Sequence, residues 1–335
     1  MDIKRTPILG PSTIKPETDK QHKPGQSKIY ISKLNEGTEA PHNTPIRDRN
    51  PKHDDALNRL ATKPKQWLSK LINDSYNENP NQRCIGSMQL FGGARYFDHP
   101  KNTVITLDCI GHPYNANTVG DSFIASHGPT TGDKSIAGLF TMAMENEGST
   151  IVNLDKQLRY WPETGEKRTY DLDNHQTLSV TTKKEEDKNT SGYDVITLEL
   201  ESNFLDKSTK EPVTEKKTLT IYHFLSWPDM GVPVDKDLQN LSGLLQTINP
   251  VTNNEKLITH CMAGIGRTST FITLLRVIKD IDSGIITSDN LLQSINDLVL
   301  DIKKARGIYA VETSDQLKLI LEQAELHLEQ HTPSK

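Results

Sequence analysis

The sequence predicts an α/β fold in which a central mixed twisted sheet is flanked by helices on both faces. Short runs of aliphatic and β-branched residues alternate with amphipathic helical patterns along the chain. Four helical patterns fill the C-terminal third, and a short apolar run passes directly into one of them. The length of 335 residues, without an internal repeat, leaves room for one large domain or two small ones.

The predicted elements follow in chain order. A helical pattern over residues 54–73 opens the folded part. Strands are predicted over residues 104–107, 123–126, 150–154, 177–181, 195–200 and 218–224, with a helix over 138–147 between them. The charged stretches 183–191 and 206–217 are predicted to be solvated hairpin loops. The closing helices cover residues 235–247, 268–282, 288–306 and 314–330.

The first fifty residues differ in composition from the rest. They contain several prolines, one aromatic residue, Tyr30, and nine Lys plus Arg against six Asp plus Glu. We therefore expect a disordered basic leader over residues 1–53, a folded domain over 54–330 and a short tail over 331–335. The leader is either a soluble extension or a segment for targeting or partner binding, for instance by a secretion chaperone.

The most informative segment is the Cys–Arg loop (residues 260–268), His-Cys-Met-Ala-Gly-Ile-Gly-Arg-Thr. It joins the apolar run 256–259 to the helical pattern 268–282, so its amides lie at a helix N-terminus, where they favour a phosphate and a thiolate. Cys261 is thus the candidate nucleophile, and Arg267 supplies a planar fork for phosphate oxygens. The residues expected to surround the phosphate are Met262, Ala263, Gly264, Ile265 and Gly266.

The residues that flank this cysteine and arginine each have two interpretations. His260 either holds the backbone around the thiolate and tunes its charge, or packs at the end of the strand. Thr268 either donates its hydroxyl to the sulfur, which would help the thiolate to leave, or caps the first helical turn.

The Cys–Arg loop resembles the His-Cys-x5-Arg-Ser/Thr signature of the classical cysteine-dependent protein tyrosine phosphatases. Upstream, the acid loop (residues 222–233) contains Trp227-Pro228-Asp229 and resembles the mobile loop that carries the general acid of that family. The resemblance implies that Asp229 protonates the leaving phenolate and that Trp227 and Pro228 form the hinge and lid. A positioned acid contributes about 10² to 10⁴ in rate to such a step.

A third segment, residues 93–98, resembles the phosphotyrosine-recognition loop of the family. The resemblance implies that the Tyr96 ring stacks on the substrate ring and that Asp98 accepts peptide N–H bonds. Phe97 replaces a basic residue found in many relatives, so a preference for acidic flanking residues does not carry over. Residues 115–117, 123–130 and 160–162 also resemble family segments, and we assign them a structural role.

Residues 306–317 resemble the loop whose glutamines position water in the family. Gln316 matches the second glutamine, whereas Glu312 occupies the place of the first. A carboxylate near a bound phosphate is electrostatically unfavourable unless it is protonated or turned away. Our hypothesis is that Glu312 slows hydrolysis of the phosphocysteine intermediate or imposes a different geometry on the water.

The resemblance implies a protein tyrosine phosphatase that acts on phosphotyrosine-containing proteins without a metal or an organic cofactor. One alternative is a dual-specificity or lipid phosphatase, although lipid phosphatases tend to carry basic residues inside the loop. A second is a catalytically slow phosphotyrosine-binding module, which Glu312 keeps open. A third is a rhodanese-like or arsenate-reducing thiolate enzyme, for which the acid loop has no obvious role.

The sequence also limits where the protein acts. No apolar run reaches the length of a membrane span, the N-terminus lacks the hydrophobic region of a secretory signal, and no nucleic-acid partner is expected. Cys84 and Cys109 are expected to be buried thiols rather than a disulfide, because a catalytic cysteine needs a reducing compartment. We therefore expect the cytoplasm, or a host cytosol for a secreted bacterial effector, which the leader and the acid loop together resemble.

Overall fold

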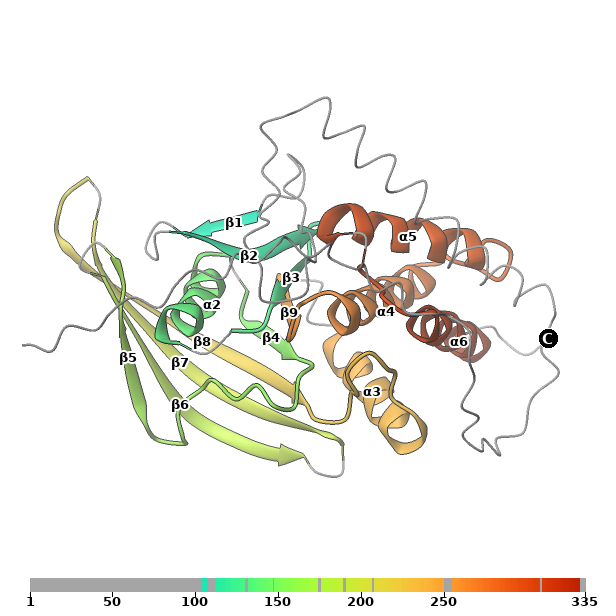
Figure 1. The fold of residues 1–335 in the computed structure, drawn as a ribbon, viewed down its shortest axis with the longest axis horizontal. Helices are drawn as coiled ribbons and strands as arrows, with labels where there is room; N and C mark the ends of the chain where they lie inside the picture. The colour runs from blue at the N-terminus through green and yellow to red at the C-terminus, as the bar shows by residue number, and fades with distance from the viewer. Residues whose placement is uncertain are drawn as a thin grey trace, which may run out of the picture. The chain divides into compact units, whose positions relative to one another are not determined.

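The computed structural model describes most of the chain beyond residue 103 (Figure 1). The described residues are 104–107, 112–129, 132–146, 148–173, 176–188, 191–206, 208–249, 255–307 and 309–331. The predicted leader (1–53), the predicted helix 54–73, Tyr96, Asp98, Cys84 and Cys109 lie outside them.

A nine-stranded mixed sheet organises the described part of the chain, in the order β1-β2-β3-β9-β4-β8-β7-β6-β5 (Figure 1). The strands are β1 (Val104–Leu107), β2 (His112–Val119), β3 (Phe123–His127), β4 (Thr150–Asn153), β5 (Lys167–Asp171), β6 (Thr177–Lys188), β7 (Tyr193–Leu205), β8 (Pro212–Phe224) and β9 (Leu257–Cys261). β3, β9, β4 and β8 run parallel, and Thr259 on β9 lies between Ala125 on β3 and Val152 on β4. The carboxyl ends of these strands therefore meet at one edge.

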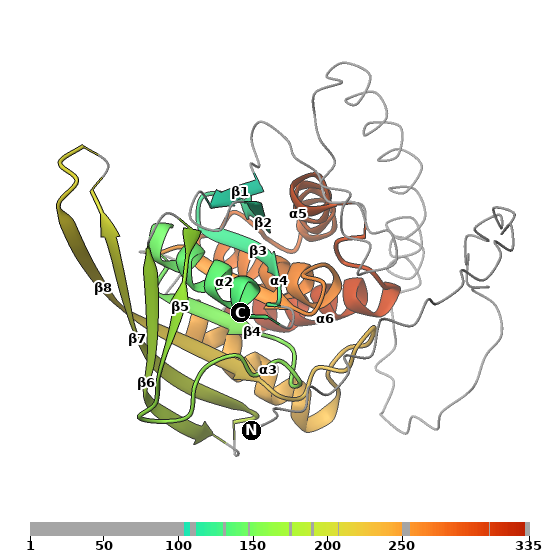
Figure 2. The ribbon, with the colours of Figure 1, turned by 60° about the vertical axis from the view of Figure 1, so that its left-hand side comes forward.

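Helices cover both faces of the sheet, which confirms the predicted fold class. α2 (Asp133–Glu145) packs on one face, and α3 (Asp235–Ile248), α4 (Gly266–Asp282), α5 (Leu291–Arg306) and α6 (Ser314–His331) pack on the other. Figures 1 and 2 both show α4, α5 and α6 as neighbours. None of the helices in the described residues combines the length and the hydropathy that a membrane span requires.

Two buried clusters explain why the central strands are apolar on both sides. Successive strand residues point to opposite faces, so Val152 and Leu257 pack against α3 to α6, whereas Ile151 and Ile258 pack against α2. A strand buried on both faces loses the polar alternation of a half-exposed strand. This explains why short apolar runs predicted β3, β4 and β9 correctly.

Several predicted boundaries were wrong, mainly in the outer strands. β6 continues to Lys188 and β8 begins at Pro212, so two thirds of the first predicted hairpin loop and half of the second are strand. Cross-strand ion pairs such as Lys183–Glu199 and Lys216–Glu201 stabilise these ends, whose composition resembles that of a loop. The helix predicted from residue 138 begins at Asp133.

Two strands were missed because neither has an apolar run. β5 is an edge strand that buries only Tyr170. β2 is rich in polar residues, yet Asn115 and Asn117 are buried there because they bind a buried arginine, Arg306, on α5.

Candidate active site

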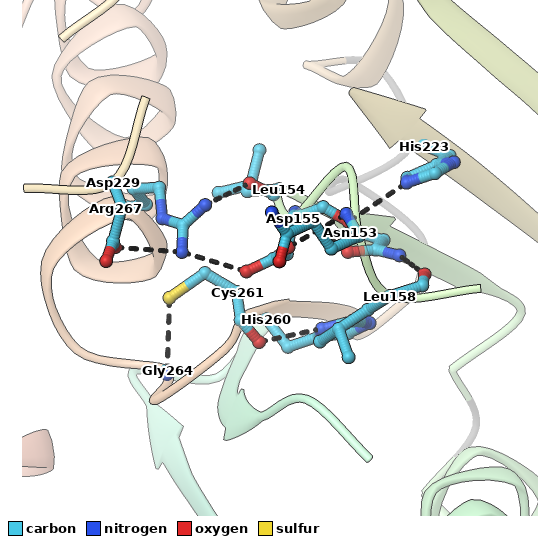
Figure 3. Close-up of polar contacts among 11 residues, drawn as sticks. Asn153, Leu154, Asp155, Leu158, His223, Asp229, His260, Cys261, Gly264 and Arg267 are labelled. Carbon is cyan, nitrogen blue, oxygen red and sulfur yellow. Dashed lines mark hydrogen bonds and ion pairs between the residues drawn. The ribbon is translucent and has the colours of Figure 1, made fainter. Parts of the chain in front are cut away.

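The Cys–Arg loop connects the carboxyl end of β9 to the first turn of α4. Cys261 is the last residue of β9, and Gly266 is the first of α4. Between them Gly264 has φ of 69°, and a Cβ there would lie 1.9 Å from the carbonyl oxygen of Ser126, so only glycine fits. Its N–H donates to Sγ of Cys261 at 3.2 Å (Figure 3).

Arg267 is almost completely buried and contacts two carboxylates. Its Nη1 donates to the Leu154 carbonyl oxygen at 3.1 Å. Its Nη2 donates to Oδ2 of Asp155 at 2.9 Å and to Oδ1 of Asp229 at 3.1 Å (Figure 3). The Asp155 carboxylate is as buried as the guanidinium, whereas the Asp229 side chain is 81% exposed. Asp155 therefore fixes the inner side of Arg267, and Asp229 contacts it from the solvent side.

Sequence reasoning missed Asp155. The segment after β4 holds it tightly: its amide donates to Oδ1 of Asn153, and its Oδ1 accepts the Gln157 amide. Nε2 of His223 donates to the carbonyl oxygen of Asp155 at 3.0 Å. The sequence does contain a signal for Asp155, because it directly follows the predicted strand 150–154. Ligand-binding groups gather at the carboxyl ends of parallel strands.

His260 is fully buried and holds the backbone of the nucleophile. Its Nδ1 donates to the Cys261 carbonyl oxygen at 3.1 Å, so Nε2 accepts the Tyr160 hydroxyl at 2.8 Å. Burial lowers the pKa of His260 to about 3, which keeps the imidazole neutral. The geometry matches the backbone-holding interpretation of His260, and it places Tyr160, whose sequence context indicates only a structural role, beside the site.

Arg306 supports the backbone of the Cys–Arg loop. It is completely buried on α5, and its Nε donates to the Gly264 carbonyl oxygen at 2.8 Å. Its Nη1 donates to Oδ1 of Asn115 at 2.9 Å and of Asn117 at 2.7 Å. The side chain thus ties the loop to β2, across a sequence separation that no local pattern reveals.

The Cys–Arg loop lines a cavity of about 340 Å³. It is lined by Asp229, Met230, Cys261, Met262, Ala263, Ile265, Gly266, Arg267, Tyr309, Glu312 and Gln316. Trp227, Thr268, His260 and Gly264 are not among the lining residues. Trp227 is buried and donates Nε1–H to the Gly231 carbonyl oxygen at 3.0 Å, which closes the turn of the acid loop. Thr268 is buried with a hydroxyl that has no partner among the described residues.

Comparison with known proteins identifies the family of the chain. The family model described as protein-tyrosine phosphatase matches residues 99–324. The chain belongs to the protein-tyrosine phosphatase family. Tyr96 and Asp98 lie just before the matched residues, so their predicted roles stay predictions.

Individual relatives agree with this family. Mouse receptor-type tyrosine-protein phosphatase alpha is 30% identical over 168 residues, which are 48% of this chain and 18% of that protein. Chicken receptor-type tyrosine-protein phosphatase eta is 35% identical over 106 residues, which are 30% of this chain and 7% of that protein. The matches therefore span less than a fifth of the length of either relative.

Solved structures support the fold. A Trypanosoma cruzi protein tyrosine phosphatase, TcPTP1, superimposes with a TM-score of 0.57 at 19% identity, covering 82% of this chain and 92% of that one. PTPN18 in complex with a HER2 phosphopeptide gives a TM-score of 0.61 at 19% identity, covering 83% and 95% of the two chains.

Glu312, just before α6, and Gln316, in its first turn, both line the cavity of this phosphatase-family site. The Oε1 atom of Gln316 accepts the Glu312 amide at 2.8 Å. Glu312 is exposed, and Oε2 of its carboxyl group lies beside Gly266 in the lining of the cavity. Desolvation and the nearby Asp229 raise the pKa of Glu312, against the opposing effect of Lys303 and Arg267.

Replacing Asp155 with asparagine should destabilise the fold. The change leaves the buried guanidinium of Arg267 without its buried counter-charge, so we expect the free energy of unfolding to fall by about 3–5 kcal/mol. Urea denaturation measures this. Asp301→Asn is the matched control, because Asp301 pairs with Arg276 at the surface, where a pair contributes about 0–1 kcal/mol. Equal losses in the two variants would contradict a special role for Asp155.

Proposed function

We propose that this chain is a protein tyrosine phosphatase that hydrolyses phosphotyrosine in proteins through a phosphocysteine intermediate. The observation that carries the proposal is the meeting of three groups in one cavity: Sγ of Cys261, the guanidinium of Arg267 and the carboxyl group of Asp229. Family membership supports the same activity. The proposed catalytic domain covers residues 54–330, with residues 1–53 as a leader.

The first step transfers the phosphoryl group to sulfur. The phosphate oxygens accept hydrogen bonds from the loop amides and from Arg267, at the N-terminus of α4, where the helix dipole also favours the thiolate of Cys261. As Sγ forms a bond to phosphorus, the bond from phosphorus to the phenolic oxygen breaks. Asp229, which is exposed and leaves Arg267 when phosphate binds, gives its proton to that oxygen.

The second step hydrolyses the phosphocysteine. Water attacks phosphorus, the sulfur–phosphorus bond breaks, and the electron pair returns to Sγ of Cys261. The unpartnered hydroxyl of Thr268 is placed one residue from Arg267, at the start of the helix, and we assign it the donor role toward the leaving thiolate. Gln316 orients the attacking water, and we assign Asp229, left as a carboxylate by the first step, as the base that takes the proton of this water.

Selectivity for tyrosine is assigned to the recognition loop. Tyr96 would stack on the substrate ring, and Asp98 would bind the peptide backbone. A cavity deep enough to need a long aromatic ester would exclude phosphoserine. Because a catalytic thiolate survives only in a reducing compartment, we propose that the activity is cytoplasmic. Delivery as a bacterial effector stays a prediction.

Replacing Asp229 with alanine should produce a substrate trap. We expect kcat on a phosphotyrosine peptide to fall by about 10² to 10⁴, because the phenolate then leaves without a proton, while KM stays the same or falls. The measurement is steady-state phosphate release together with capture of phosphotyrosine proteins from an extract.

The control for the trap is Asp289→Ala, in an exposed turn before α5. It should change neither kcat nor capture. Release of phosphate from phosphoserine peptides by the unsubstituted protein, at a rate comparable to phosphotyrosine, would contradict the assignment to tyrosine.

A further inference from the structure

The segment that presents Glu312 is held under backbone strain. Val311, directly before it, has φ of 52°, which is rare for a β-branched residue. The buried Nζ of Lys303 on α5 donates to the carbonyl oxygens of Ala310 and Val311. Strain of this kind persists only where the surroundings enforce it, so these contacts fix the backbone position from which Glu312 extends.

Gln316 is oriented by the same segment. Its side chain is completely buried, and its Oε1 accepts the Glu312 amide at 2.8 Å. The other side-chain atom, Nε2, therefore turns toward the loop, and it has no hydrogen-bond partner among the described residues. A buried amide without a partner is costly, which indicates that a ligand or a water completes it.

The two side chains face one point beside Gly266. A Cβ atom on Gly266 would lie 2.9 Å from Oε2 of Glu312 and 3.1 Å from Nε2 of Gln316. A side chain at this position would crowd both groups, so the glycine allows the carboxylate and the amide to lie beside the loop, in the cavity that Cys261 also lines. The amide is not bonded to the carboxylate, so a water between them would find one donor and one acceptor.

We propose that Glu312 is a second catalytic base, which takes a proton from the water that hydrolyses the phosphocysteine. The inference rests on the proposed phosphatase activity. As the water oxygen bonds to phosphorus, the sulfur–phosphorus bond breaks, its electron pair returns to Sγ of Cys261, and one water proton passes to Oε2 of Glu312. Gln316 donates Nε2–H to the same water and orients it. This role corresponds to the second of our two hypotheses for Glu312, a different geometry for the water.

The charges around Glu312 set the direction of its pH dependence. Desolvation and then Asp229 on the acid loop raise the pKa of Glu312, whereas Lys303 on α5 and Arg267 on α4 lower it. A base must be ionised to accept a proton, so the rate of phosphocysteine hydrolysis should rise with pH through this elevated pKa. Below it, Glu312 is protonated and accepts no proton.

The decisive test removes the carboxylate of Asp229, so that Glu312 is the remaining base. Rapid-quench kinetics with p-nitrophenyl phosphate, whose leaving group needs little protonation, separates phosphocysteine formation from its hydrolysis. We expect Asp229→Asn to hydrolyse the intermediate within about tenfold of the unsubstituted protein. Adding Glu312→Gln to Asp229→Asn should slow hydrolysis by about a further 10²-fold, remove its rise with pH and leave the formation rate within twofold.

The control is Asp229→Asn combined with Glu211→Gln, the same change at an exposed residue before β8. It should hydrolyse the intermediate like Asp229→Asn alone. Equal hydrolysis rates with and without Glu312→Gln, or a stable phosphocysteine in Asp229→Asn alone, would overturn the second base but leave the phosphatase intact. An unsubstituted protein that forms no phosphocysteine would overturn both proposals.

Discussion

Replacing Cys261 with serine should abolish turnover of phosphotyrosine peptides, by at least about 10⁴-fold, while the fold and peptide binding are retained. A hydroxyl is a far weaker acid than a thiol, so the Gly264 amide and the N-terminus of α4 cannot hold it as an anion. Phosphate release measures the loss, and calorimetric binding with a thermal melt shows that the protein is intact.

The serine variant also separates the alternatives that the sequence left open. A phosphotyrosine-binding module would bind the peptide equally well with either residue and would show no turnover in the unsubstituted chain. Retention of more than about one per cent of the activity by Cys261→Ser would mean that another group attacks phosphorus.

Replacing Arg267 with lysine should lower kcat/KM by about 10³- to 10⁵-fold, the range seen when an arginine that stabilises a phosphoryl-transfer transition state is lost. One ammonium cannot bond the Leu154 carbonyl oxygen and Asp155 while presenting a planar fork to phosphate oxygens. Steady-state kinetics on a phosphotyrosine peptide measures the effect.

The matched control for this change lies on the same helix. Arg276 pairs with Asp301 at the surface of α4, so Arg276→Lys should alter kcat/KM by no more than about twofold. A loss of similar size in both variants would show that the effect arises from instability of α4 rather than from phosphate binding.

The groups that sequence could predict are those defined by local spacing. Cys261, Arg267 and the glycines between them lie within one turn from strand to helix, and Asp229 lies in a recognisable loop. Their meeting in one cavity follows from the parallel order of β9, β4 and β8, which places the ends of these strands at one edge.

The supporting groups could not be predicted because long-range pairing defines them. Asp155 reaches Arg267 only because β4 lies beside β9, and Arg306 reaches Gly264 only because α5 packs near β2. Tyr160 bonds His260 across a hundred residues of sequence. The same reason explains the polar strand β2, whose asparagines are compatible with burial only once Arg306 is present.

The measurement that tests the central claim most directly is to trap the intermediate. The unsubstituted protein is quenched in acid during turnover of a phosphotyrosine peptide, digested and examined by mass spectrometry. Phosphocysteine catalysis predicts one phosphate on the peptide that contains Cys261, and none after Cys261→Ser. Turnover without phosphate on that peptide, or phosphate on another residue, would contradict it.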